Sequence, residues 1–248
     1  MDKVMVITGA GRGIGAATAL LAAERGYAVC INYLRDESSA SALCARLERA
    51  GAKAIAVAGD VASEPDVLRL FEETDRRLGR PSALVNNAGI VDRGSRAEDM
   101  SAARLARMFA INITGSFLCA REAVKRMSRK RGGRGGAIVN VSSIAARLGA
   151  AGEYVDYAAS KAAIDTFTVG LAKEVGPDGI RVNAVRPGVI RTDIHLSSGD
   201  PGRVERIGAA APLGRPGEPE EIARTILWLL SDEASYLTGA LVDVTGGR

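Results

Sequence analysis

The sequence predicts a protein of the α/β class, with a doubly wound, mainly parallel sheet covered by helices on both faces. Short apolar, β-branched runs alternate with longer stretches of helical pattern along the 248 residues, as expected when helices connect parallel strands. Neither a linker nor an internal repeat interrupts this alternation. We therefore expect residues 1–248 to form a single domain.

Seven short apolar runs are the predicted strands. In chain order they are Val4–Thr8, Ala28–Asn32, Ala54–Ala58, Ala83–Asn86, Ala137–Val141, Arg181–Val185 and Ala240–Val244. The stretch Gly13–Arg25 is a predicted helix, because Ile14, Ala17 and Leu21 recur at helical spacing. Similar stretches, rich in alanine, leucine and arginine, lie between most of the other strands.

The composition is that of an ordinary globular protein, with 47% hydrophobic residues and a formal net charge of +4. The charges are dispersed, which suits an anionic cofactor or substrate and does not indicate a nucleic-acid partner. The arginine- and glycine-rich segment Arg129–Gly136 is short, internal and without aromatic residues. We interpret it as a flexible loop that joins a helix to a strand, with RNA binding as the less favoured alternative.

Cysteine and histidine are scarce. Cys30, Cys44 and Cys119 lack metal-ligand spacing, and the one histidine is His195, so we expect neither a disulfide framework nor a metal site. The N-terminal residues do not follow the plan of a signal peptide. No apolar run approaches the roughly 18 residues that span a bilayer. We therefore expect a cytoplasmic protein with no membrane partner.

A glycine-rich turn follows the first predicted strand. It has the pattern T-G-x-x-x-G-x-G, and the candidate cofactor residues in it are Thr8, Gly9, Gly11, Arg12, Gly13, Ile14 and Gly15. Glycines let the backbone approach a pyrophosphate, and the next helix presents free N–H groups and the positive end of its dipole. Because this turn lies where a Rossmann-type sheet binds dinucleotides, it predicts such a cofactor. A tight strand-to-helix turn that needs glycine for steric reasons alone is the alternative.

Two further strand ends carry candidate cofactor residues. Asp60 and Val61 follow the third strand, and Asn87, Ala88 and Gly89 follow the fourth. The carboxyl ends of parallel strands form one edge of the sheet, so these residues are expected in the same crevice. A purely structural role for Asp60 and Asn87, as helix caps and turn formers, is the alternative.

The end of the second strand bears on the choice between NADP(H) and NAD(H). An acidic residue about 20 positions after the glycines binds the ribose hydroxyl of NAD, but the chain has Asn32, Tyr33 and Arg35 here and no carboxylate before Asp36. Arg12 and Arg35 could instead bind a 2′-phosphate. We therefore favour NADP(H) over NAD(H), the alternative being that both arginines are ordinary surface residues.

Tyr157 and Lys161 are the candidate reactive pair, and the alternative is that their spacing marks only a partly exposed helix face. Their spacing of four residues places them on one face of a helix. A nearby cation favours the phenolate and should lower the pKa of Tyr157, which would let it exchange a proton with a carbonyl or alcohol oxygen. Tyr154 does not qualify, because Ala158 occupies the corresponding position.

Ser143 and Asn112 are further candidates. Ser142 and Ser143 end the fifth strand, where a hydroxyl can donate to a substrate oxygen; a loop or capping serine is the alternative. Asn112 lies within a predicted helix, where asparagine is unfavourable, and such exceptions often mark functional positions.

Together these motifs resemble the short-chain dehydrogenase/reductase family. The resemblance covers nearly the whole chain, and its motifs are Thr8–Gly15, Asp60-Val61, Asn86–Gly89, Asn112, Ser143, Tyr157, Lys161, and Pro187-Gly188 followed by Thr192. It implies a seven-stranded doubly wound sheet, a bound NAD(P)(H), and a homotetramer or homodimer.

The resemblance also implies a role for each residue. Tyr157 would be the general acid/base, Ser143 would orient the reacting oxygen, and Lys161 would lower the pKa of Tyr157 and bind the nicotinamide ribose. Asn112 would hold a proton-relaying water. Asp60 and Val61 would bracket the adenine. The segment with Pro187, Gly188, Val189 and Thr192 would lie against the nicotinamide, with Thr192 meeting its carboxamide.

Two positions depart from the family pattern. Ser143 precedes Tyr157 by fourteen residues where many members have thirteen, which we attribute to one extra residue in Gly149–Asp156, with Ser142 as the alternative. The C-terminal V-D-G-G of many members is Val244-Thr245-Gly246-Gly247 here.

The expected reaction interconverts a carbonyl and a secondary alcohol by hydride transfer. Residues 189–213 would form the substrate lid, which lacks aromatic residues and contains His195 and several arginines. We favour an NADPH-dependent ketone or 3-oxoacyl reductase. The alternatives are a sugar or polyol dehydrogenase and, from another class, a non-catalytic redox sensor, which the presence of Tyr157 and Lys161 argues against.

Overall fold

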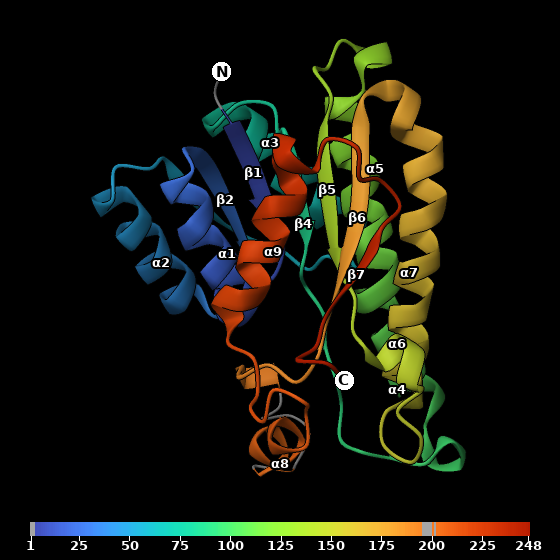
Figure 1. Cartoon of the computed structure of the whole chain (residues 1–248). Coiled ribbons are helices and arrows are strands. Elements are labelled where there is room, and N and C mark those ends of the chain that lie inside the picture. Colours follow the sequence, from blue (N-terminus) through green and yellow to red (C-terminus); the bar gives the residue numbers. More distant parts are fainter. Residues whose placement is uncertain (1–2, 195–199, 201) are drawn as a thin grey trace.

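The computed structural model describes residues 3–194, 200 and 202–248 and contains one seven-stranded sheet (Figure 1). The strands are β1 (Lys3–Ile7), β2 (Tyr27–Tyr33), β3 (Ala54–Ala58), β4 (Ala83–Asn86), β5 (Gly136–Val141), β6 (Ile180–Pro187) and β7 (Leu241–Val244). Their order is β3-β2-β1-β4-β5-β6-β7, and every neighbouring pair is parallel. The predicted doubly wound fold is confirmed.

Helices cover both faces of this sheet. They are α1 (Gly13–Glu24), α2 (Glu37–Arg49), α3 (Glu64–Arg77), α4 (Ala102–Phe109), α5 (Gly115–Met127), α6 (Ala145–Leu148), α7 (Val155–Val175), α8 (Arg203–Ala209) and α9 (Pro219–Leu230). Helices α1, α2 and α9 pack on one face, and α3, α5 and α7 pack on the other. The short helix α8 lies beyond the carboxyl ends of the strands (Figure 1).

The strands divide their side chains between two apolar cores. Met5 and Ile7 of β1 lie in the core under α1, α2 and α9, whereas Val6 lies in the core under α3, α5 and α7. In β2, Val29 and Ile31 alternate with Cys30 in the same way. Because successive side chains of a strand point to opposite faces, a continuous apolar run is needed when both faces are buried.

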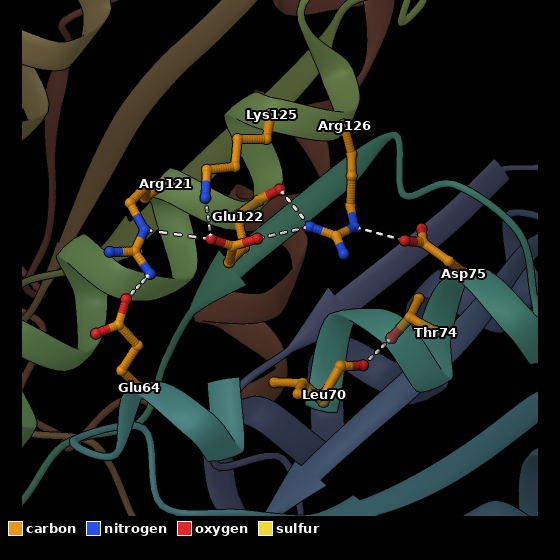
Figure 2. A network of polar contacts seen from close by, with 8 residues as sticks. All are labelled: Glu64, Leu70, Thr74, Asp75, Arg121, Glu122, Lys125 and Arg126. Carbon is orange, nitrogen blue, oxygen red and sulfur yellow. Dashed lines mark hydrogen bonds and ion pairs between the residues drawn. The ribbon is translucent and has the colours of Figure 1, made fainter. Parts of the chain in front are cut away.

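A charged network joins α3 to α5 on the second face (Figure 2). The Glu122 carboxylate is 3% exposed and contacts Lys125 at 2.7 Å and Arg126 at 2.8 Å. Arg126 in turn binds Asp75 of α3 at 2.6 Å. The network thus fixes α5, whose N-terminal end leads to the site, against its neighbouring helix.

Two predictions about local structure gain detail. The segment Arg129–Gly136 joins α5 to β5 as expected, and it begins with a 3₁₀ turn over Arg129–Arg131, where Lys130 pairs with Asp178 at 2.7 Å. The helix around Asn112 is not a regular α-helix, because Ala110–Thr114 form a π-helical turn between α4 and α5. Within the described ranges, no helix is long and apolar enough to cross a membrane.

The connectivity places the site. The chain moves from β1 outward to β2 and β3, then returns to β4 on the other side of β1. Where the order reverses, the loops after β1 and β4 separate and leave a crevice at the carboxyl ends of the strands. Both the glycine turn and the Asn87–Gly89 segment border this crevice.

Candidate functional site

A cavity of about 660 Å³ opens at the carboxyl edge of the sheet and unites most of the predicted site residues. Those that line it are Gly9, Gly11, Arg12, Gly13, Ile14, Asn32, Tyr33, Arg35, Asp60, Val61, Asn87, Ala88, Gly89, Ser143, Tyr157, Lys161, Pro187, Gly188, Val189 and Thr192. The cavity therefore extends from the glycine turn to the Tyr157 helix, as one site for cofactor and substrate requires.

Three predicted residues lie behind the described lining of this cavity: Thr8, Gly15 and Asn112. The Thr8 hydroxyl oxygen accepts hydrogen bonds from the backbone N–H groups of Asn87 and Ala88, each at 3.0 Å, so it joins β1 to β4. A Cβ at Gly15 would lie 2.6 Å from Asn87 Nδ2. Thr8 and Gly15 thus support the turn that borders the cavity, and their expected contact with the cofactor stays a prediction.

The glycine turn has a backbone that other residues would strain. Gly9 and Gly13 have φ angles of 60° and 56°, in the left-handed region. A Cβ on Gly9 would lie 2.9 Å from Ala88 Cα. Asn87 Nδ2 donates to the carbonyl oxygens of Thr8 and Gly9, at 2.9 and 3.0 Å, which fixes the turn. The turn is thus rigid and leaves space for a phosphate group beside the N-terminus of α1.

Asn32 braces the same turn from the end of β2. Its Oδ1 accepts the Gly9 N–H at 3.2 Å, and its Nδ2 donates to the Gly59 carbonyl at 3.0 Å. This buried amide therefore joins the loops after β1 and β3, next to Asp60. Its role in the described structure is to hold the cavity wall.

The end of the cavity near α2 holds two exposed guanidinium groups, Arg12 and Arg35. The nearest carboxylate in sequence, Asp36, is occupied as the N-cap of α2. It accepts hydrogen bonds from Ser38 Oγ at 2.9 Å and from Ser39 N–H at 3.0 Å. Hydrogen bonds from the Ser39 side chain and backbone, and from Ser38, lower the pKa of Asp36 to about 2, with a smaller effect of Arg12.

Tyr157 and Ser143 meet at the other end. The half-buried Tyr157 is in the first turn of α7, and its hydroxyl forms a hydrogen bond with Ser143. Burial raises the pKa of Tyr157, and the Ser143 hydrogen bond opposes this shift. Burial is therefore the dominant influence on the pKa of Tyr157 in this structure, and the lowering expected of Lys161 stays a prediction.

Lys161 lies one turn further along α7 and is 5% exposed. Its Nζ donates to the Val141 carbonyl at 2.7 Å and lies 5.6 Å from the centroid of the Tyr157 ring. Burial lowers the pKa of Lys161 to about 8, against a smaller raising effect of Asp165. This ammonium is thus confined next to the Tyr157 ring.

The two serines of β5 have different surroundings. Ser142 is 2% exposed, and its hydroxyl donates to the Lys161 carbonyl at 3.1 Å. Ser143 contacts the Tyr157 hydroxyl. This geometry favours Ser143 over Ser142 as the residue that contacts substrate.

Asn112 connects three segments from the π-helical turn. Its Oδ1 accepts the Ile90 N–H at 2.8 Å, and its Nδ2 donates to the Ile90 carbonyl and to Ser160 Oγ, both at 3.0 Å. The π-helical turn widens the helix so that this amide reaches both the loop after β4 and α7. Such turns often occur at functional sites.

The substrate end includes residues that sequence reasoning did not single out. Ile90 and Val91 line the cavity from the loop after β4, and Leu148 does so from α6. From the predicted lid, Arg203 of α8 approaches Glu153 to 2.6 Å and lies over the Tyr154 ring. These contacts join segments far apart in the chain, which spacing alone does not reveal. His195, the other lid candidate, lies outside the described residues.

Sequence matches to known proteins cover almost the whole chain. The family model described as enoyl-(acyl carrier protein) reductase matches residues 9–248. An uncharacterized oxidoreductase of Escherichia coli K12, YgfF, is 51% identical over 99% of both chains. A 3-oxoacyl-(acyl-carrier-protein) reductase of Synechocystis is 39% identical over 99% of this chain and 96% of its own.

The fold is similar to that of a solved structure. The 3-ketoacyl-(acyl-carrier-protein) reductase of Brucella melitensis, crystallised with NADH, has a TM-score of 0.91 and 32% identity, covering 99% of this chain and 98% of its own. The chain belongs to the short-chain dehydrogenase/reductase family. It is accordingly an NAD(P)-dependent oxidoreductase acting on CH–OH and C=O groups.

Proposed function

We propose that this enzyme is an NADPH-dependent reductase of a ketone or 3-oxoacyl substrate. The observation that carries the proposal is the shared cavity: Tyr157 and Ser143 lie at one end, and Arg12 and Arg35 lie at the other. No carboxylate precedes Asp36 at the end of β2, and Asp36 is engaged by its own helix. Guanidinium groups at this position favour a 2′-phosphate.

The cavity fits a dinucleotide by its own geometry. The left-handed glycines Gly9 and Gly13 leave the backbone accessible next to the N-terminus of α1, where a pyrophosphate is stabilised. Gly13, Ile14, Asp60 and Thr192 line the same cavity. The bound nicotinamide group supplies the hydride in reduction and accepts it in oxidation.

The chain's own residues supply the proton. Ser143 donates a hydrogen bond that orients the carbonyl oxygen, and the Tyr157 hydroxyl gives this oxygen its proton as hydride reaches the carbon. The Lys161 ammonium favours the phenolate that remains. In alcohol oxidation each proton moves in the opposite direction. Burial raises the pKa of Tyr157, so its hydroxyl keeps the proton that reduction consumes.

Cofactor choice is tested by titrating the purified protein with NADPH and NADH, following nicotinamide fluorescence. We expect tighter binding of NADPH, and Arg35→Ala should weaken NADPH binding about 10- to 100-fold while NADH binding stays nearly constant, since a hydrogen bond to a charged group is worth about 1.5–3 kcal/mol. Arg25→Ala, an exposed arginine at the C-terminus of α1, is the matched control. Equal effects of Arg35→Ala on both cofactors would contradict the 2′-phosphate contact.

The substrate class is tested next with 3-oxoacyl thioesters, simple ketones and sugars. Preferred reduction of the oxo compounds supports a reductase. Preferred oxidation of a sugar or polyol would contradict the reductase and indicate a dehydrogenase instead. The proposed roles of the site residues would stay the same. The cytoplasmic location, the lid role of residues 189–213 and the homotetramer or homodimer remain predictions from the sequence.

A further inference from the structure

A buried ion pair connects α4 to the start of α7, next to Tyr157. Arg104 Nε and Nη2 donate to the two carboxylate oxygens of Asp156, at 2.7 and 3.2 Å. The Asp156 side chain is fully buried, and that of Arg104 is 13% exposed. Such a two-pronged contact fixes both the distance and the orientation of the two helices.

The same guanidinium reaches a third segment. Arg104 Nη1 donates to the Arg93 carbonyl at 2.8 Å, in the loop that follows β4. This loop also contains Ile90 and Val91, which line the substrate end of the cavity. One side chain therefore joins α4, the loop after β4 and the first turn of α7.

Asn112 joins the corresponding three segments eight residues further along the same helical segment. It binds Ile90 of the loop after β4 and Ser160 of α7. Asp156 immediately precedes Tyr157, and Ser160 follows it by three residues, with the Ser160 hydroxyl donating to the Tyr157 carbonyl at 2.7 Å. Tyr157 is thus held between two polar contacts that come from one helical segment.

The Asp156 carboxylate is also coupled to the Tyr157 backbone. Burial alone would raise the pKa of Asp156, but the hydrogen bonds from Arg104 and from the Tyr157 N–H outweigh it and lower that pKa. A buried ion pair adds little net stability compared with apolar residues of the same size, because both charges lose their hydration. Its two-pronged geometry and its place next to Tyr157 therefore favour a positioning role.

We propose that Arg104 and Asp156 are positioning residues that hold the Tyr157 hydroxyl against Ser143, as a second clamp beside Asn112. This inference rests on the proposed role of Tyr157 as the general acid/base. It adds two residues to the machinery of the reaction, although neither lines the described cavity wall.

The test compares Asp156→Asn and Arg104→Met, which keep side-chain size, with the wild-type enzyme in both reaction directions. We expect kcat to fall about 10- to 100-fold, since small displacements of reacting groups have effects of this order. In Asp156→Asn the KM for substrate and the Kd for NADPH should change less than about twofold, because Arg104 still donates to the Arg93 carbonyl of the loop that lines the substrate end. Arg104→Lys keeps one donor and should recover part of the lost kcat.

The pH profile separates positioning from mere stability. When Tyr157 leaves Ser143 it loses the hydrogen bond that opposes its raised pKa. The pH of half-maximal alcohol oxidation should therefore move upward in both variants. Arg96→Met removes an exposed ion pair with Glu98, ahead of α4, and should leave kcat and this profile unchanged.

Two outcomes would overturn the inference. One is wild-type kcat and pH profile in both folded variants. The other is a loss of activity that follows the folded fraction, measured by thermal unfolding, while the pH profile does not move. Tyr157→Phe is assayed in parallel: if it retains turnover, the proposed role of Tyr157 as the general acid/base fails, whereas an inactive Tyr157→Phe with normal Arg104 and Asp156 variants rejects the clamp alone.

Discussion

At the scale of single residues, the buried lysine of the site makes the stability of the protein depend on pH. Burial lowers the pKa of Lys161 to about 8. In the unfolded chain a lysine keeps its proton up to a pH of about 10.4. Between these two pKa values the Lys161 amine is protonated in the unfolded state and neutral in the folded state. The contribution of Lys161 to the free energy of unfolding therefore rises with pH.

Lys161→Met should remove this rise. We expect the difference in free energy of unfolding between wild type and variant to shift in favour of wild type, by up to about 3 kcal/mol, from pH 8 to pH 10.5. The buried thiols of Cys30 and Cys119, with pKa values of about 12, act in the opposite direction. They are present in both proteins and cancel in the difference. Urea unfolding at several pH values measures it, and a constant difference would disprove the lowered pKa.

Sequence spacing together with the family resemblance singled out Tyr157, Lys161 and Ser143 as candidates, and the structure brings all three to one cavity. Sequence spacing could not give the direction of the Tyr157 pKa, which depends on how deeply the ring is buried. Nor could it pair Arg104 with Asp156, because 52 residues separate them in the chain and the fold alone brings them together.

At the scale of elements, the glycine turn depends on close packing as well as on backbone freedom. Gly15 lies within α1, where alanine would normally be favoured by about 1 kcal/mol. Here a Cβ would lie 2.6 Å from Asn87 Nδ2 and 2.8 Å from Ala10 Cα. A Cβ on Gly11, in the same turn, would have its nearest neighbour, Ala40 N, at 4.0 Å.

Gly15→Ala should therefore destabilise the cofactor-free protein by about 1–3 kcal/mol, as overpacking does. Gly11→Ala is the matched control and should change the free energy of unfolding by less than about 0.5 kcal/mol. Denaturant unfolding without cofactor gives both values. Similar losses in the two variants would mean that close packing at Gly15 is not the cause.

The Glu122 network joins α3 to α5, so the stability of this contact depends on the charge of the Glu122 carboxylate (Figure 2). Burial alone would raise the pKa of Glu122, but the hydrogen bonds from Lys125 and Arg126 lower it. The resulting stability is complete above the unfolded pKa of about 4.3 and is lost as the pH falls through the lower folded value.

Glu122→Gln should destabilise the protein by about 3 kcal/mol at pH 7, because Arg126 loses a buried partner. The penalty should disappear at low pH, where Glu122 is itself neutral. Glu73→Gln, which breaks an exposed ion pair with Arg76 on α3, should have an effect below about 1 kcal/mol. Thermal or urea unfolding at pH 7 compares the two, and equal effects would contradict the role of burial.

The π-helical turn at Ala110–Thr114 could not be predicted from the sequence. Asn112 stood out because asparagine is unfavourable inside a helix, but the same sequence is compatible with a regular α-helix. What selects the wider turn is the amide's contacts with Ile90 and Ser160, which exist only after β4 and α7 have assembled. Local preference marked the position, and tertiary contacts determined its geometry.

At the scale of the whole molecule, the fold was the most predictable feature. All seven strands were anticipated with small differences at their ends, because most of them are buried on both faces and read as largely apolar runs. The order of the strands follows from right-handed crossovers and the reversal after β3. The substrate end was less predictable, because α6, α8 and the loop after β4 each contribute a few side chains.

One cavity contains the residues proposed for cofactor binding and those proposed for proton transfer. The two sets belong to different elements of the fold. Removing the proton donor should therefore leave cofactor binding intact. Tyr157→Phe lacks the hydroxyl and keeps the ring, so NADPH should still bind with nearly wild-type affinity.

The decisive measurement is the rate of carbonyl reduction by Tyr157→Phe at saturating NADPH, with the bound fraction followed by nicotinamide fluorescence. We predict a loss of at least about 100-fold in kcat, the lower range for a general acid, with NADPH still bound. Turnover within a few-fold of wild type in a variant that binds NADPH would contradict the assignment of Tyr157 as the proton donor.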